Sequence, residues 1–120
     1  MHDITEGGCY GALWEILSAS CFGCQVNIAD VPVLPETKAI CDALELDPLG
    51  LISSGSLLIT APSDIPVVEA VARAGVKAYP VGMVTNGLRE LIFPDGKRQD
   101  LPEPMEDELW RFLAQGYLEE

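Results

Sequence analysis

The chain has 120 residues, which suits one compact domain that can bury a core without a disulfide or metal staple. Hydrophobic residues make up 48% of it, as in a globular protein, and no apolar run approaches the roughly 18 residues of a membrane span. The net charge of −12 argues against non-specific binding to nucleic acid or anionic membrane, which both reward clusters of Lys and Arg. No leader-like start supports secretion, so we expect a cytoplasmic location and reduced thiols at the four cysteines.

The first predicted element is a helix over residues 6–20. Apolar side chains recur there at helical spacing and define one face, and Thr5 precedes them as a candidate N-cap. The residues of this face are Tyr10, Leu13, Trp14, Leu17 and Cys21.

A strand and a second helix follow. The alternating stretch "QVNIA" over residues 25–29 predicts a short strand. A proline-rich loop then leads into a helix over residues 36–46, whose inward side chains we expect to be Ile40, Ala43 and Leu44.

The middle of the chain predicts a buried strand, "SLLITA", over residues 56–61. Ser63 or Asp64 can then cap a third helix, which Gly75 ends. The apolar stripe of this helix is Ile65, Val68, Val71 and Ala72.

The last part predicts two strands, over residues 76–84 and 88–94, joined by the turn signal "TNG". Pro80 marks the first of them as an edge strand or a bulge, and "PDGK" is a tight turn. A final helix over residues 105–116 has acidic residues in its first turn and ends at Gly116. Its apolar face comprises Met105, Leu109, Phe112 and Leu113.

The order of elements predicts an α/β (α+β) fold. Helices alternate with strands, and a mixed sheet of four or five strands with flanking helices, in a three-layer-like arrangement, accommodates them. We expect one domain over residues 1–120.

The opening motif, "HDITEGG", is the strongest candidate for chemistry. Gly7 and Gly8 at a helix start leave the backbone N–H groups open to a phosphate, which the helix dipole also favours. The carboxylate of Asp3 just ahead could hold Mg²⁺. The alternative is structural: Asp3 and Thr5 cap the helix, and the glycines permit tight packing.

A longer pattern extends this motif. "MHDITEGGCYGALWEI", "VPVLPETKAICDALELDPLGLISSGSLLIT", "YPVGMVT" and "DELWRFL" together resemble the C-terminal domain of the AIR synthase-related superfamily. That superfamily includes aminoimidazole ribonucleotide synthase, thiamine-monophosphate kinase, selenophosphate synthetase and a hydrogenase maturation factor.

The resemblance implies an ATP-dependent reaction that activates an amide or carboxylate oxygen by phosphoryl transfer. It implies that Asp3 reaches Mg²⁺ on ATP, and that Thr5, Gly7 and Gly8 shape the phosphate end of the cofactor site. It also implies an N-terminal ATP-binding domain as partner, with a possible homodimer. Because that domain is absent here, we expect an excised or separated half that closes the ATP·Mg²⁺ site of a parent protein and is inactive alone.

Two departures from the superfamily pattern bear on this reading. Several relatives have Glu where this chain has Ser53-Ser54-Gly55. The chain ends "GYLEE" rather than in a cysteine-bearing tail, which argues against the hydrogenase factor proper.

Three other interpretations remain open. The chain could be a non-enzymatic binding or dimerisation module. Cys21 and Cys24 form a C-x-x-C pair that could be redox-active or half of a zinc site, although ordinary free thiols are the simpler interpretation. Trp14 and Trp110 fit packing better than ligand stacking.

Overall fold

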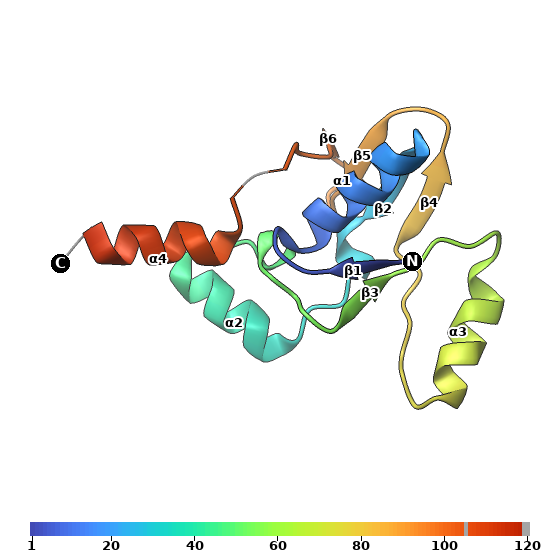
Figure 1. The fold of residues 1–120 in the computed structure, drawn as a ribbon, viewed down its shortest axis with the longest axis horizontal. Helices are drawn as coiled ribbons and strands as arrows, with labels where there is room; N and C mark the ends of the chain where they lie inside the picture. Colours follow the sequence, from blue (N-terminus) through green and yellow to red (C-terminus); the bar gives the residue numbers. More distant parts are fainter. Residues whose placement is uncertain (105, 119–120) are drawn as a thin grey trace. The chain divides into compact units, whose positions relative to one another are not determined.

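The computed structural model describes residues 1–104 and 106–118, and Figure 1 shows the order of their elements. They form two compact units. Unit 1 comprises Met1–Cys21, Val33–Leu58 and Leu101–Glu120, and unit 2 comprises Phe22–Pro32 and Ile59–Asp100. The single domain expected over residues 1–120 remains a prediction.

Unit 1 contains two strands, three α-helices and a 3-10 helix, joined by loops. Its elements are β1 (His2–Ile4), α1 (Gly8–Ser20), α2 (Pro35–Leu44), the short 3-10 helix η2 (Pro48–Gly50), β3 (Ser56–Leu58) and α4 (Glu108–Leu118).

Strands β1 and β3 lie side by side although more than fifty residues separate them in sequence (Figure 1). They pair antiparallel, with His2 opposite Leu58 and Ile4 opposite Ser56. The predicted "SLLITA" strand is therefore shorter than expected, and it is not deeply buried, because Leu57 is 55% exposed. A two-stranded sheet shields a strand on one edge alone, so it cannot enclose β3.

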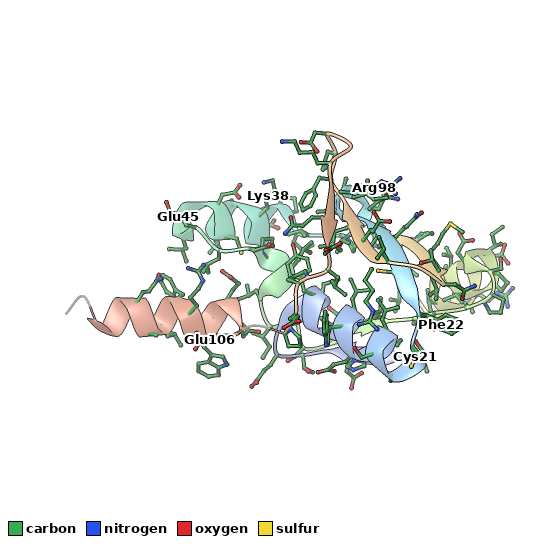
Figure 2. All side chains as sticks on the ribbon, turned by 90° about the horizontal axis from the view of Figure 1, so that it is seen from above. Cys21, Phe22, Lys38, Glu45, Arg98 and Glu106 are labelled. Atoms are coloured by element: carbon green, nitrogen blue, oxygen red, sulfur yellow. The ribbon has the colours of Figure 1, made fainter. Side chains whose placement is uncertain are left out.

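The core of unit 1 forms around α1. Its buried apolar residues are Ala12, Leu13, Leu17, Cys41, Leu49 and Leu101. The predicted face of α1 is confirmed at Leu13 and Leu17, but Cys21 is exposed (Figure 2). The helix ends at Ser20, and Cys21 takes a left-handed conformation with φ 61°, which turns it away from the helical face.

The predicted inward face of α2 is wrong. Cys41 is buried, whereas Ile40 is 60% and Leu44 is 42% exposed, and Ala43 is exposed too. Within unit 1 the helix turns its cysteine side inward and leaves these apolar side chains uncovered.

Unit 2 holds a four-stranded mixed sheet, which confirms that part of the predicted fold. Its elements are β2 (Gly23–Asn27), the 3-10 helix η1 (Ile28–Asp30), α3 (Asp64–Arg73), β4 (Gly82–Thr85), β5 (Arg89–Ile92) and β6 (Arg98–Asp100). The strand order is β4-β2-β5-β6, and β2 is parallel to β5 and antiparallel to β4.

The turn at "TNG" joins β4 to β5 as predicted, but these two strands do not pair with each other, because β2 lies between them (Figure 1). Cys24 and Val26 of β2 and Leu91 of β5 are each at most 3% exposed. Burial of these side chains favours β2 in the centre of the sheet over a local hairpin.

Other boundaries in unit 2 agree in part. Strand β2 begins two residues before "QVNIA", and β4 is an edge strand, as Pro80 indicated. Ser63 stands at the N-cap of α3, and Gly75 follows its end with φ +81°. Val68 and Val71 are half-buried as expected, but Ile65 and Ala72 are exposed.

The turn at "PDGK" is confirmed, and it connects β5 to β6, a strand that the sequence did not predict. Phe93 N–H donates to Lys97 O at 2.9 Å, and Gly96 there has φ +84°.

The final helix differs from its prediction at both ends. Helix α4 begins at Glu108 and continues through Gly116 to Leu118. Met105, predicted on its apolar face, lies outside the described residues. None of the described helices has both the length and the apolar character needed to span a bilayer.

Candidate functional site

The glycine turn, defined here as residues Thr5–Gly8, connects β1 to α1. Gly7 is the N-cap of α1 with φ +82°, a conformation that favours glycine, and no side chain caps the helix. The prediction of Thr5 as the N-cap is therefore wrong. The backbone oxygen of Thr5 accepts from Gly8 N–H at 3.1 Å instead, while its side chain is exposed.

Gly8 is buried against the backbone of "DPLGL". Its φ is +63°, and a Cβ there would lie 2.5 Å from Leu49 O and 2.6 Å from Leu51 O. Only a hydrogen fits that space, so tight packing explains this glycine. At Gly7 a Cβ would meet nothing closer than Gly11 Cα at 3.6 Å, so its backbone conformation explains that one.

The carboxylate of Asp107 binds the glycine turn. Asp107 is 4% exposed, and its Oδ2 accepts from Gly7 N–H at 2.7 Å. Its Oδ1 accepts from Leu109 N–H at 2.9 Å in the first turn of α4. One buried carboxylate therefore joins the starting residues of α1 and α4.

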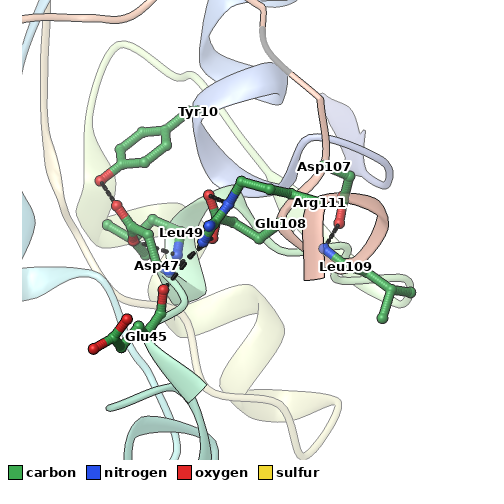
Figure 3. Close-up of polar contacts among 8 residues, drawn as sticks. All are labelled: Tyr10, Glu45, Asp47, Leu49, Asp107, Glu108, Leu109 and Arg111. Atoms are coloured by element: carbon green, nitrogen blue, oxygen red, sulfur yellow. Dashed lines mark hydrogen bonds and ion pairs between the residues drawn. The ribbon is translucent and has the colours of Figure 1, made fainter. Parts of the chain in front are cut away.

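A chain of polar contacts runs beside this carboxylate and links four helical segments (Figure 3). Tyr10 on α1 donates to Asp47 Oδ2 at 2.9 Å, and Asp47 Oδ1 accepts from Leu49 N–H at 3.0 Å. Asp47 N–H donates to Glu108 Oε2 at 3.3 Å, and Arg111 contacts the same carboxylate from one turn further along α4.

Arg111 also donates to Glu45 O at 3.0 Å, at the end of α2. Its hydrogen bond to Glu108 lowers the pKa of that carboxyl below the usual 4.5. On the other side, burial and the hydrogen bond to Asp47 raise the pKa of Tyr10 above its usual 10.0. The network therefore favours a charged Glu108 and a neutral Tyr10.

A hollow of about 380 Å³ opens between the start of α1 and the segment that leads into α4. The first side of the hollow is lined by Glu6, Gly7, Tyr10, Gly11 and Glu15, and the second by Asp47 and Gly50, which stand just before η2 and at its end. The third side is lined by Pro102, Glu103, Pro104, Glu106, Asp107, Glu108 and Trp110. Seven of these lining residues are acidic and none is basic. Electrostatics here favour a cation, or an anion that arrives with a metal.

The remaining predicted site residue, Asp3, lies on β1 and is exposed. Its neighbour His2 places Nδ1 2.6 Å from Asp3 O and pairs through Nε2 with Glu15 on α1. The predicted roles of Asp3, Thr5, Gly7 and Gly8 toward a nucleotide stay predictions.

The cysteines are free thiols in unlike surroundings. Burial raises the pKa of Cys9 to about 11, and it also raises the pKa of Cys24 and Cys41 above 9.0. Within residues 1–104 and 106–118, no group of three or more His, Cys, Asp or Glu is placed to hold a metal ion. The C-x-x-C zinc interpretation therefore has no support among these residues.

Sequence reasoning did not single out Asp47, Asp107, Glu108 or Arg111. The two aspartates do carry a local signal, because aspartate is a common N-cap residue. Asp47 stands directly before η2, and Asp107 stands directly before α4. Their partners lie up to 100 residues away along the chain, so spacing alone could not pair them.

The fold has clear counterparts among solved structures. Escherichia coli HypE superposes with a TM-score of 0.76 at 26% identity, over 92% of this chain and 36% of that one. The hydrogenase maturation protein HypE in complex with ATP superposes with a TM-score of 0.73 at 28% identity, over 88% of this chain and 35% of that one. The class is thus the mixed α/β fold of these AIR synthase-like proteins.

The sequence makes the family explicit. The family described as "AIR synthase related protein, C-terminal domain" matches residues 1–93, and the chain belongs to it. The carbamoyl dehydratase HypE of Cupriavidus necator is 36% identical over 98 residues, which are 81% of this chain and 26% of that protein. The chain spans about a quarter of the length of the curated relatives it matches.

These relatives belong to the hydrogenase maturation branch, which the ending "GYLEE" had argued against. The expectation drawn from that ending, that the chain is not the hydrogenase factor proper, stays a prediction. The superfamily resemblance drawn from the opening motif is confirmed.

Proposed function

We propose that this chain acts as the C-terminal domain of an ATP-dependent protein of the AIR synthase-related family, and closes a nucleotide site formed with an N-terminal domain. The observation that carries the proposal is the family match over residues 1–93, which includes the glycine turn. The share of each relative that the chain covers supports a partner domain that supplies the remaining nucleotide contacts.

The reaction we propose is phosphoryl transfer from ATP to an amide oxygen. Curated relatives are named carbamoyl dehydratases, and removing oxygen from a carbamoyl group requires a good leaving group at that oxygen. Phosphorylation supplies one. Catalysis of this kind depends on positioning and on neutralising charge, both of which need groups from two sides of the phosphates. We therefore expect no turnover from this chain alone.

Mg²⁺ would supply the charge neutralisation, and Asp3 fits part of a site for it. An exposed carboxylate is a hard oxygen ligand, and no hydrogen bond or ion pair from the described part of the chain engages it. Since no larger cluster of candidate ligands exists in that part of the chain, the other ligands would come from the phosphates and the partner domain. Thr5, Gly7 and Gly8 would shape the phosphate end.

A second candidate, a non-enzymatic binding or dimerisation module, is favoured by exposed apolar side chains on α2 and in the loop before it. Leu34 is 69%, Ile40 is 60% and Leu44 is 42% exposed. Exposed apolar side chains mark a protein–protein interface where they form one contiguous patch. Sedimentation equilibrium on the purified chain tests this candidate, which predicts a stable homodimer or higher assembly.

The deciding experiment combines this chain with the N-terminal half of an AIR synthase-related protein and measures ATP turnover. We expect turnover only in the mixture, and a loss of at least about tenfold in Asp3→Asn, because one metal ligand is missing. Asp30→Asn, an exposed aspartate of unit 2, is the matched control. Full activity in Asp3→Asn would remove Asp3 from the mechanism, and turnover by this chain alone would refute the two-part site.

A further inference from the structure

Both glycine amides of the turn are already engaged within the chain. Gly8 N–H donates to Thr5 O at 3.1 Å, and Gly7 N–H donates to Asp107 Oδ2 at 2.7 Å. The second contact is a charge-assisted hydrogen bond to a carboxylate that is almost fully buried. An anion therefore already occupies the position at which a phosphate oxygen would meet Gly7.

The segment that brings this anion lies beyond the family match. The match ends at residue 93, whereas Asp107 precedes α4 in the stretch that begins at Leu101. The same stretch supplies one side of the acidic hollow, from Pro102 to Trp110. This stretch contacts the glycine turn through the Asp107–Gly7 hydrogen bond.

We propose that Asp107 is a built-in stand-in for phosphate, and that α4 is an autoinhibitory latch which must leave the glycine turn before a phosphate group can bind there. The proposal rests on the function proposed above. One N–H cannot serve two anions, and a carboxylate and a phosphate at that distance repel each other. Asp107 also caps α4 through Leu109, so displacing it loosens the first turn of the helix.

The latch implies an equilibrium between a closed state, in which Asp107 contacts the glycine turn, and an open state, in which it does not. In the closed state the carboxylate of Asp107 accepts hydrogen bonds from the N–H groups of Gly7 and Leu109. In the open state both of these hydrogen bonds are broken. A phosphate ligand binds only the open state, so its apparent affinity is reduced by the fraction of chains that are closed.

The test uses the whole chain and inorganic pyrophosphate with Mg²⁺ as the probe, because the acidic hollow favours an anion that arrives with a metal. Asp107→Asn keeps an oxygen that can cap α4 but removes the charge that competes with phosphate. We expect this variant to bind pyrophosphate about tenfold more tightly than the unaltered chain at fixed ionic strength, measured by calorimetry. Glu106→Gln, which removes one carboxylate from the same hollow, is the matched control, and we expect less than about a twofold change for it.

A second measurement needs no variant. Amide hydrogen exchange on the unaltered chain should show Leu109 losing protection when pyrophosphate shifts the Gly7 resonance, because Asp107 leaves both amides together. If Asp107→Asn does not fold, this measurement decides alone.

Three outcomes overturn the latch. Equal tightening by Asp107→Asn and Glu106→Gln would show general charge repulsion. Pyrophosphate binding that perturbs Gly7 while Leu109 stays protected would show that Asp107 does not move, and would leave the proposed function standing. Absence of pyrophosphate binding in every variant would refute both the latch and the phosphate role of the glycine turn.

Discussion

The hydroxyl of Tyr10 lies 2.9 Å from Oδ2 of Asp47, and this hydrogen bond connects the first turn of α1 to the start of η2. Both oxygens of Asp47 are used, since Oδ1 accepts from Leu49 N–H. Leu49 is buried in the core of unit 1. The bond therefore helps to hold the segment against which Gly8 packs.

Removing this hydroxyl should weaken unit 1. We expect Tyr10→Phe to lower the free energy of unfolding by about 1 kcal/mol, the usual net value of one such hydrogen bond. Urea denaturation measures the change, with Tyr79→Phe, an exposed tyrosine of unit 2, as the control. Equal stabilities of the two variants would contradict the role of the Tyr10–Asp47 bond.

The two glycines of the turn should differ in their response to alanine. Gly8→Ala combines a φ of +63° with a Cβ 2.5 Å from Leu49 O, so we expect a loss of about 2–4 kcal/mol or failure to fold. For Gly7→Ala we expect a loss of about 1 kcal/mol, because the added Cβ has room and only the positive φ is unfavourable. Thermal denaturation of both variants compares them. A larger loss at Gly7 would refute the packing explanation of Gly8.

Acid should weaken the contact between α4 and η2. The hydrogen bond from Arg111 holds the pKa of Glu108 below its usual 4.5, so the folded state prefers the charged carboxylate. Its contribution to stability is full above about pH 4.5 and is lost as the pH falls through the lowered value. We expect Glu108→Gln to flatten the acid limb of a stability-versus-pH curve.

The control for that curve is Glu69→Gln, an exposed glutamate of α3. Its acid limb should match that of the unaltered chain. If Glu108→Gln retains the full acid dependence, the Arg111–Glu108 pair does not stabilise the fold.

The four thiols should react at distinct rates. Cys21 is exposed, whereas burial raises the pKa of Cys24, of Cys41 and, to about 11, of Cys9. Since the thiolate is the reactive form, iodoacetamide at pH 8 should label one thiol per chain rapidly and the others only on unfolding. Mass spectrometry identifies the site, and Cys21→Ser should abolish the rapid phase. Rapid labelling of Cys24 would restore the C-x-x-C redox interpretation.

Local patterns predicted most elements because each depends on neighbours in sequence. Three features were recoverable in this way: the apolar spacing of α1, the N-cap position of Ser63 in α3 and the "PDGK" turn. The face of α2 was not, because Ile40 and Leu44 are apolar enough to predict burial while the core of unit 1 takes Cys41 instead. Strand β6, the sequence "RQD", has no apolar signal, and its pairing with β5 creates it.

In the candidate site, too, local features could be predicted from the sequence and long-range contacts could not. The motif "HDITEGG" indicated the family and the place of a glycine turn, because backbone conformation at a helix start depends on a few adjacent residues. What the turn contacts was decided only in three dimensions. Gly8 meets the backbone of Leu49, and Gly7 meets a carboxylate 100 residues away. Buried polar groups must find partners wherever the chain brings them, and that choice depends on packing, which no local pattern encodes.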